Sequence, residues 1–233
     1  MLILGIDTAT PQVGCAIGGH EGVLGSFHSA RDRRHAETLV PAIDFLLTST
    51  RIELSDIAAV AVDTGPGLFT GLRVGVVTAK AMASALRVPV VCVSSLDLLA
   101  FPVRWTNRLI ASVVDARRGE VFYALYRHVP GGVQRLSEPQ VATPDELCSE
   151  LLARNEECLA VGDGAQRYAD ALEDIGGVKA GEAGLAFPSA ASLVQLSHAR
   201  ALREEFVNAW EVEPVYLRKA DAEINWNIRE RPR

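Results

Sequence analysis

The sequence predicts an α/β protein made of two successive units, each a mixed β-sheet with helices. Short apolar runs of strand length alternate along the chain with segments whose apolar residues recur at helical spacing. The order strands, helix, strand, helix also occurs twice, although no sequence repeat is legible. The 233 residues suffice for one large domain or two small ones, and we place the units at residues 1–103 and 104–233.

The first unit is expected to open with three strands, residues 2–6, 13–17 and 23–27, joined by a polar turn and a glycine-rich hairpin. Helices and strands then alternate at residues 35–48, 57–62, 72–86, 89–93 and 95–100. Such an opening differs from the βαβ start of dinucleotide-binding folds. It suits the actin, hexokinase and Hsp70 class of duplicated domains.

The second unit is expected to hold further strands followed by helices. Thr143 is a good N-cap for a helix that begins at Pro144, because proline is tolerated at the first helical position. The predicted strands of this unit lie at residues 109–114, 121–126, 133–136 and 159–161. The predicted helices lie at residues 144–154 and 189–203, with another that follows the strand 159–161 and ends near residue 174.

Composition argues against an independent RNA-binding or membrane protein. The net charge is −6 and the isoelectric point about 5.4, whereas a protein that gripped tRNA alone would carry a basic face for the phosphates. The one dense basic run, residues 31–34, is interpreted as a solvated loop. Apolar runs are too short to span a bilayer, and the N-terminus does not resemble a signal peptide. Cysteines form no C-x-x-C pair. We therefore expect a cytoplasmic protein.

Two segments are candidates for a nucleotide site that has lost its function. Asp7 and Thr8 follow the first strand, where they either face a nucleotide's phosphates or merely cap the turn. The glycine-rich loop 65–71 precedes a helix whose first amides can bind an anion, or it is a structural turn. It lacks the lysine of a P-loop. The candidate residues are Asp7, Thr8, Gly65, Gly67, Thr70 and Gly71.

The helix predicted over residues 72–86 is apolar on two stripes. One stripe runs through Val74, Val77, Ala81 and Ala85, and the other comprises Gly75, Ala79, Met82 and Leu86. Because a helix lying on a sheet needs only one apolar stripe, two stripes favour a second contact, such as a partner interface. The alternative is a helix sandwiched inside its own domain.

Catalytic machinery is not recognisable. The histidines are dispersed, with no pair at metal-ligand spacing, and no nucleophile signature is present. We predict no catalytic residue and no metal ligand.

Four blocks of the sequence, in order from end to end of the chain, resemble the TsaB (YeaZ) family of bacterial tRNA threonylcarbamoyladenosine biosynthesis. They are ILGIDTAT at 3–10, GPGLFTGLRVG at 65–75, DARRGEVF at 115–122 and EPVYLR at 213–218. The resemblance implies two duplicated lobes of the actin-like ATPase (ASKHA, ribonuclease H-like) fold. It also implies a non-catalytic subunit that scaffolds and activates the catalytic paralogue TsaD, which modifies adenosine 37 of tRNAs reading codons that start with A.

In this family the pairing with TsaD uses the first two helices, here 35–48 and 72–86. The ATPase TsaE joins the pair, a homodimer is expected without the partner, and tRNA is bound only through the complex. No cofactor is expected in this chain, since ATP or ADP and a metal ion belong to the partner subunits. The expected interface residues are His35, Leu39, Ile43, Leu46, Arg73, Val76, Ala79, Lys80, Met82, Ala83 and Leu86.

One departure from the catalytic paralogue concerns its histidine-rich metal motif, which follows the strand equivalent to 89–93. Here that stretch reads SSLDLL at 94–99, and serine and leucine do not replace imidazole as metal ligands. The chain is therefore not expected to transfer the group itself. A stand-alone actin-like ATPase or kinase remains the alternative, and a metallopeptidase is the weakest because its ligands are missing.

Overall fold

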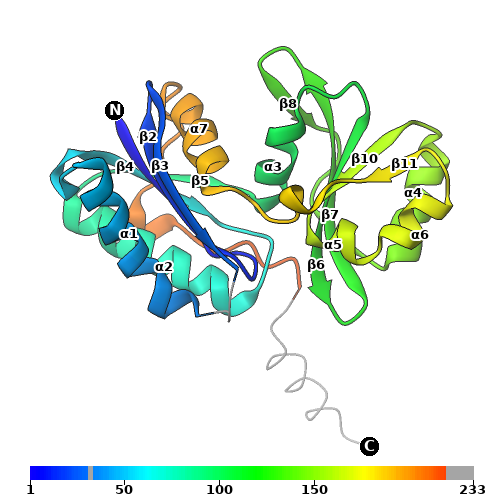
Figure 1. Ribbon diagram of the computed structural model, residues 1–233, viewed down its shortest axis with the longest axis horizontal. Helices are drawn as coiled ribbons and strands as arrows, with labels where there is room; N and C mark the ends of the chain where they lie inside the picture. The colour runs from blue at the N-terminus through cyan, green and yellow to red at the C-terminus, as the bar shows by residue number, and fades with distance from the viewer. Residues whose placement is uncertain (31–33, 219–233) are drawn as a thin grey trace, which may run out of the picture.

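The computed structural model describes residues 1–30 and 34–218, which form two lobes side by side (Figure 1). The first lobe contains a five-stranded sheet in the order β3-β2-β1-β4-β5. Strands β1, β2 and β3 are antiparallel, whereas β4 and β5 run parallel to β1. The strands are β1 Leu2–Asp7, β2 Val13–Gly19, β3 Gly22–Ser29, β4 Ile57–Asp63 and β5 Val90–Val93.

Helices cover both faces of this first sheet. On one face, α1 (His35–Thr50) and α2 (Phe69–Leu86) pack against the strands through side chains such as Leu39, Ile43 and Val76. On the other face, α7 (Ala190–Ala201) packs through Leu193 and Val194. Figure 1 shows the sheet between these helices. The first lobe is thus a three-layer sandwich in which burial of both sheet faces provides the main stabilisation.

The second lobe holds a six-stranded sheet with the path β11-β10-β6-β7-β8, and β9 pairs with β7. Its strands are β6 Leu109–Arg117, β7 Glu120–Val129, β8 Gly132–Arg135, β9 Gln140–Ala142, β10 Cys158–Val161 and β11 Val178–Ala180. One face is covered by α4 Pro144–Arg154, α5 Asp163–Arg167 and α6 Ala169–Asp174. Helix α4 begins with the predicted Thr143 cap, reinforced by a reciprocal bond to Glu146.

Two helices lie in a different lobe from the one predicted by sequence order. Helix α3 (Ser95–Ala100), assigned to residues 1–103, packs Leu96 and Leu99 against the second sheet. Helix α7, assigned to residues 104–233, packs on the first sheet. The predicted boundary therefore separates the two sheets but assigns these helices wrongly. The reason is that each sheet has an apolar face against which a helix from the other half of the chain packs.

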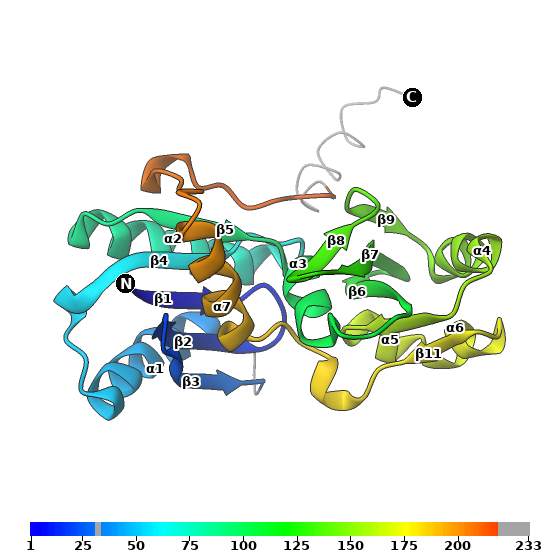
Figure 2. The same ribbon diagram turned by 90° about the horizontal axis from the view of Figure 1, so that it is seen from above.

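The last described residues, 207–218, form a strap that connects the two lobes; we call it the C-terminal strap. It begins with an antiparallel bridge between Val207 and Val90 and continues into the short helix η4 (Ala209–Glu211) beside α2. It ends where Arg218 Nη1 lies 2.7 Å from Glu120 Oε2 of the second lobe. Figure 2 shows its orange ribbon running from α2 toward the second lobe.

Three further short 3-10 helices complete the described chain: η1 Leu54–Asp56, η2 Phe101–Val103 and η3 Ala183–Leu185. Over residues 1–30 and 34–218, no helix has the length and apolar character needed to cross a membrane.

Candidate functional site

Asp7 and Asp63 lie next to each other in the first lobe, at the carboxyl ends of the paired parallel strands β1 and β4. Both side chains are essentially fully buried. Asp7 Oδ1 accepts a hydrogen bond from the amide of Ala9 at 3.0 Å. Asp63 Oδ1 accepts from the amide of Gly65 at 2.8 Å and from Ser95 Oγ at 2.7 Å. The sequence analysis identified Asp7 but missed Asp63, whose role depends on the pairing of the two strands.

The remaining carboxyl oxygens, Asp7 Oδ2 and Asp63 Oδ2, are buried and have no hydrogen-bond partner in the described part of the chain. Burial raises the pKa of Asp7 well above its ordinary value, and repulsion from Asp63 raises it further. Burial also raises the pKa of Asp63, although its bonds from Gly65 and Ser95 oppose the shift. Because the pKa of each carboxyl is raised and each carboxyl interacts with the other, the two aspartates titrate as a coupled pair.

The glycine-rich loop packs against the turn that follows β1. Thr8 Oγ1 donates to the carbonyl oxygen of Gly71 at 2.7 Å, and the amide of Leu68 donates to the carbonyl oxygen of Ala9 at 2.7 Å. A Cβ atom added to Gly71 would lie 2.1 Å from the carbonyl oxygen of Thr8. The predicted close backbone approach is therefore present, but its partner is the chain's own turn.

This arrangement does not fit a nucleotide phosphate with a metal ion. The carboxyl of Asp7, which would face the metal, is buried and has a raised pKa, and the hydroxyl of Thr8 and the amide of Leu68 already have partners. The remaining candidates are Gly65, Gly67 and Thr70. Gly65 and Gly67 lie in the same loop, and Gly67 packs against the backbone of Ala9. Thr70 is exposed. The geometry gives these residues a structural role in joining α2 to β1.

A second acidic group lies at the β6–β7 hairpin. Asp115 is only 4% exposed, and its Oδ2 atom pairs with Arg117 Nη1 at 2.8 Å and with Arg167 Nη1 at 3.3 Å. The sequence analysis used this charged turn only as part of the family resemblance and predicted no partner for Asp115. The contact that it missed is the ion pair with Arg167 of α5, a residue far from the hairpin in sequence but next to it in the fold.

Most of the predicted interface residues are buried inside the first lobe. The inward-facing side chains are each at most 6% exposed and belong to the core or, for His35, bond the carbonyl oxygen of Thr10. They cannot contact a partner, which corrects the prediction for His35, Leu39, Ile43, Leu46, Val76, Ala79 and Ala83. Met82 and Leu86 are half-buried at the edge of the same core.

The two basic residues predicted for the interface hold the C-terminal strap. Lys80 Nζ donates to the carbonyl oxygens of Trp210 and Val212 at 3.2 and 3.1 Å. The guanidinium of Arg73 lies 3.9 Å from the centre of the Phe69 ring, and its Nε atom is 3.3 Å from Tyr216 Oη. Both side chains thus have partners within the chain.

A different set of apolar side chains on the same two helices faces outward. Val40 and Phe45 of α1 are 61% and 60% exposed, and Val77 of α2 is 63% exposed. The exposed Ala81 and Ala85 continue the stripe of Val77. We call these five residues the outer face of α1 and α2. Of the two stripes predicted on α2, the one through Val77 is exposed from Val77 onward, whereas its first residue, Val74, and the stripe through Ala79 pack against the core.

The segment 94–99, where the catalytic paralogue has its metal motif, has a structural role here. Ser94 caps α3, Ser95 bonds Asp63, and Leu96, Leu98 and Leu99 are buried in the cores. In the part of the chain that the structure describes, no group of three or more His, Cys, Asp or Glu side chains has a geometry suited to a metal ion.

Comparison with known proteins agrees with this geometry. The family model for "TsaD: tRNA N6-adenosine threonylcarbamoyltransferase" matches residues 23–226. The chain is 30% identical to the tRNA threonylcarbamoyladenosine biosynthesis protein TsaB of Bacillus subtilis, over 97% of this chain and 98% of that protein. It is 31% identical to TsaB of Escherichia coli, over 94% and 95%.

Among solved structures, YeaZ from Pseudomonas aeruginosa superposes with a TM-score of 0.78 at 27% identity, over 93% of this chain and 99% of that chain. The two lobes have the actin-like ATPase fold predicted from the opening strands. The chain belongs to the TsaB (YeaZ) family.

Proposed function

We propose that this chain acts in the biosynthesis of threonylcarbamoyladenosine in tRNA, as a non-catalytic subunit that pairs with a TsaD-type catalytic paralogue. Pairing would use the outer face of α1 and α2. A TsaE-type ATPase would join this pair, and the chain would form homodimers when the paralogue is absent. Membership of the TsaB family supports the pathway, and the exposed apolar helices support the mode of pairing.

The observation that carries the proposal is the outer face itself. Val40, Phe45 and Val77 are each at least 60% exposed, yet they lie on helices whose inner stripes already fill the core. Large apolar side chains that are this exposed on adjacent helices are common where a protein pairs with a partner. Alanines at positions 81 and 85 would let a second helix approach closely.

Two features support a scaffold rather than an independent enzyme. Asp7 and Thr8 are occupied by internal bonds, as described above, so a stand-alone ATPase would first have to break them. The chain is also acidic, with a net charge of −6, so we expect tRNA to bind through the complex. ATP or ADP and the metal ion would accordingly bind to the partner subunits. The reaction would take place in the cytoplasm.

A reconstitution with one component omitted tests the function. Unmodified tRNA is incubated with the TsaD-type paralogue, the TsaE-type ATPase and the enzyme that forms threonylcarbamoyl-adenylate from threonine, bicarbonate and ATP. These three substrates are supplied, and the reaction is run with and without this chain. Mass spectrometry then counts the modified adenosine. We expect modification only when the chain is present. Equal modification without it would refute the activator role.

The pairing surface is tested with Phe45→Glu and a matched control, Leu152→Glu. Leu152 is 61% exposed on α4 of the second lobe, almost equal to the 60% of Phe45. Only Phe45→Glu should abolish co-elution with the paralogue, and both variants should keep the melting temperature of the parent. Retained pairing by Phe45→Glu would refute the interface. Charged substitutions at Ala79 are unsuitable, because that residue is 0% exposed and the variant would unfold.

A further inference from the structure

Strand β3 forms one edge of the first sheet, because it pairs with β2 alone in the described part of the chain. In an antiparallel strand at an edge, every second residue directs its N–H and C=O groups away from the neighbouring strand. No backbone or side-chain hydrogen bond from another described segment reaches these groups in β3. A row of donors and acceptors is therefore open along this edge.

The other edges of the two sheets are protected. Val207 of the C-terminal strap pairs with Val90 of β5. In the second sheet, β8 and β11 have only four and three residues and carry Arg135 and Lys179, and β9 has three residues. Short edge strands and charged side chains are the usual devices that stop a sheet edge from pairing with another chain. Each of these edges is thus covered, short or charged.

Strand β3 lacks such protection. It has eight residues and contains no Asp, Glu, Lys, Arg or Pro. Its irregularity, a shift of register opposite Ile17 and Gly18 of β2, is confined to the first half of the strand, and the pairing of residues 25–29 is regular. The open edge is therefore longest and most regular in the second half of β3.

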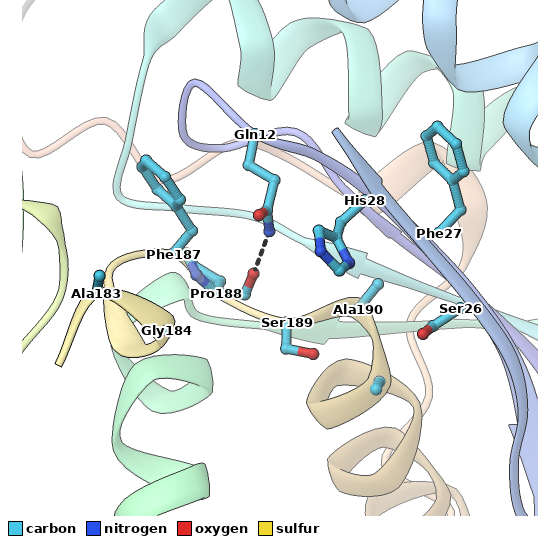
Figure 3. Close-up of a pocket in the computed structure, with 11 residues that line it drawn as sticks. Gln12, Ser26, Phe27, His28, Ala183, Gly184, Phe187, Pro188, Ser189 and Ala190 are labelled. Carbon is cyan, nitrogen blue, oxygen red and sulfur yellow. Dashed lines mark hydrogen bonds between the residues drawn. The ribbon is translucent and has the colours of Figure 1, made fainter. Parts of the chain in front are cut away.

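A cavity of about 270 Å³ lies beside this second half, next to the start of α7. Ser26 and His28 of β3 line it on one side, and residues 183–191 line it on the other. Figure 3 shows both β3 side chains beside the cavity. Gln12 Nε2 donates to the carbonyl oxygen of Pro188 at 2.9 Å, so the wall opposite β3 is tied to the turn after β1.

The lining of this cavity favours an uncharged guest. It includes no Asp, Glu, Lys or Arg, and Phe187, Pro188 and Ala190 make part of the wall apolar. A charged group would lose its hydration there without gaining a partner of opposite charge. The volume of about 270 Å³ suits one or two side chains better than a whole small-molecule ligand, whose pockets typically measure ~300–1,000 Å³.

The open edge and the cavity match one kind of occupant. An extended peptide added to a sheet edge binds through its main-chain hydrogen bonds, and its alternate side chains enter pockets on one face. A strand paired with residues 25–29 would place those side chains next to Ser26 and His28, beside the cavity. We infer that the β3 edge binds an extended, uncharged segment of a partner protein, with one apolar side chain of that segment in the cavity.

The inference does not depend on the proposed pairing. The outer face of α1 and α2 lies on one side of the sheet, whereas the cavity lies on the side of α7. The full chain and a synthetic peptide are therefore sufficient for the test.

The probe is the peptide acetyl-KTVTLTVK-amide, which has strand-forming Thr and Val residues, a central leucine for the cavity and terminal lysines for solubility. Titration into the ¹⁵N-labelled chain, up to about 2 mM, should give saturable amide shifts at residues 24–29. A version that is N-methylated at the six central residues keeps the side chains but lacks the amide donors, so it should give no saturable shift. A version with glycine in place of the leucine should bind at least about tenfold more weakly.

The variant Ser26→Lys places a charge on the edge and beside the cavity, and it should weaken binding by about tenfold or more. The matched control is Gln134→Lys on β8, an edge strand of the second sheet, where the affinity should change less than about twofold. Both side chains are exposed, so both variants should keep the melting temperature of the parent chain.

The inference is overturned if the peptide gives no saturable shifts at residues 24–29, or if the N-methylated version or the Ser26→Lys variant binds as tightly as the parent pair. Equal binding of the glycine version would overturn the role of the cavity. Sedimentation of the chain without peptide identifies a second copy as the occupant. A dimer that Ser26→Lys dissociates, but Phe45→Glu does not, would assign the edge to self-association and overturn the partner segment.

Discussion

Replacing Asp7 with Asn should make the free energy of unfolding less dependent on pH. The folded-state pKa of Asp7 is raised well above 3.8 by burial and by repulsion from Asp63. The folded protein therefore keeps a proton that the unfolded chain releases. The stabilisation is fully present below the unfolded pKa and is lost as the pH rises toward the folded pKa.

The magnitude follows from the number of protons. Between pH 4.5 and 6, each proton retained only by the folded state lowers the free energy of unfolding by about 2 kcal/mol, at roughly 1.4 kcal/mol per pH unit. Asp63, with a folded pKa of about 6 against 3.8, contributes in the same direction. The parent should thus lose about 3.5 kcal/mol over this window, about 2 kcal/mol through Asp7 and about 1.5 kcal/mol through Asp63, which has released half of its proton at pH 6. The Asp7→Asn variant should lose only the part due to Asp63, about 1.5 kcal/mol.

The amide of the Asp7→Asn variant is close in shape to a protonated acid and can donate to Asp63 in the same way. The fold should consequently survive, and at pH 7 or above the variant should be as stable as the parent or more stable. Urea unfolding, followed by circular dichroism at half-unit steps of pH, provides the free energies. Equal pH slopes for parent and variant would refute the raised pKa of Asp7, as would a variant that is less stable at pH 8.

Two further predictions concern close packing and the contact between the lobes. Gly71→Ala should lower the free energy of unfolding by roughly 2 kcal/mol or more, because the added methyl group would clash with the turn after β1. Gly132→Ala is the control: no atom lies within 4 Å of a Cβ atom added there, so the free energy of unfolding should change by less than about 0.5 kcal/mol. Equal effects would contradict the packing argument. Asp97→Asn should cost about 3 kcal/mol, because Asp97 of α3 pairs with Arg135 of β8 at 2.6 Å and Arg200 of α7 at 3.0 Å. An unchanged melting temperature would show that these ion pairs do not hold the lobes together.

Much of the secondary structure is predictable from local pattern. The first three strands and the helix beginning at His35 were placed to within about two residues, because their apolar periodicity and glycine-rich turns are strong local signals. Helix α2 instead begins at Phe69, three residues before its predicted start. Gly71 was assigned to the loop, but it lies in the first turn, where the absence of a side chain permits contact with Thr8.

The candidate interface shows where local pattern fails. Periodicity revealed two apolar stripes on α2, but it did not reveal which stripe packs on the sheet. The residues chosen included Ala79 and Val76, which are buried in the core, and omitted Val77, which is 63% exposed. Orientation of a helix about its own axis depends on the sheet beneath it, and no local signal in the helix specifies that sheet.

The sequence by itself determined the α/β class, the two successive sheets, the positions of most strands and helices, and the resemblance to the TsaB family. These features depend on the order and spacing of residues near one another in the chain. Only the tertiary structure decided that Asp7 meets Asp63, that α3 packs on the second sheet and α7 on the first, and that Val40, Phe45 and Val77 are exposed. These features depend on contacts between segments far apart in sequence, where packing and burial rather than local propensity select the partner.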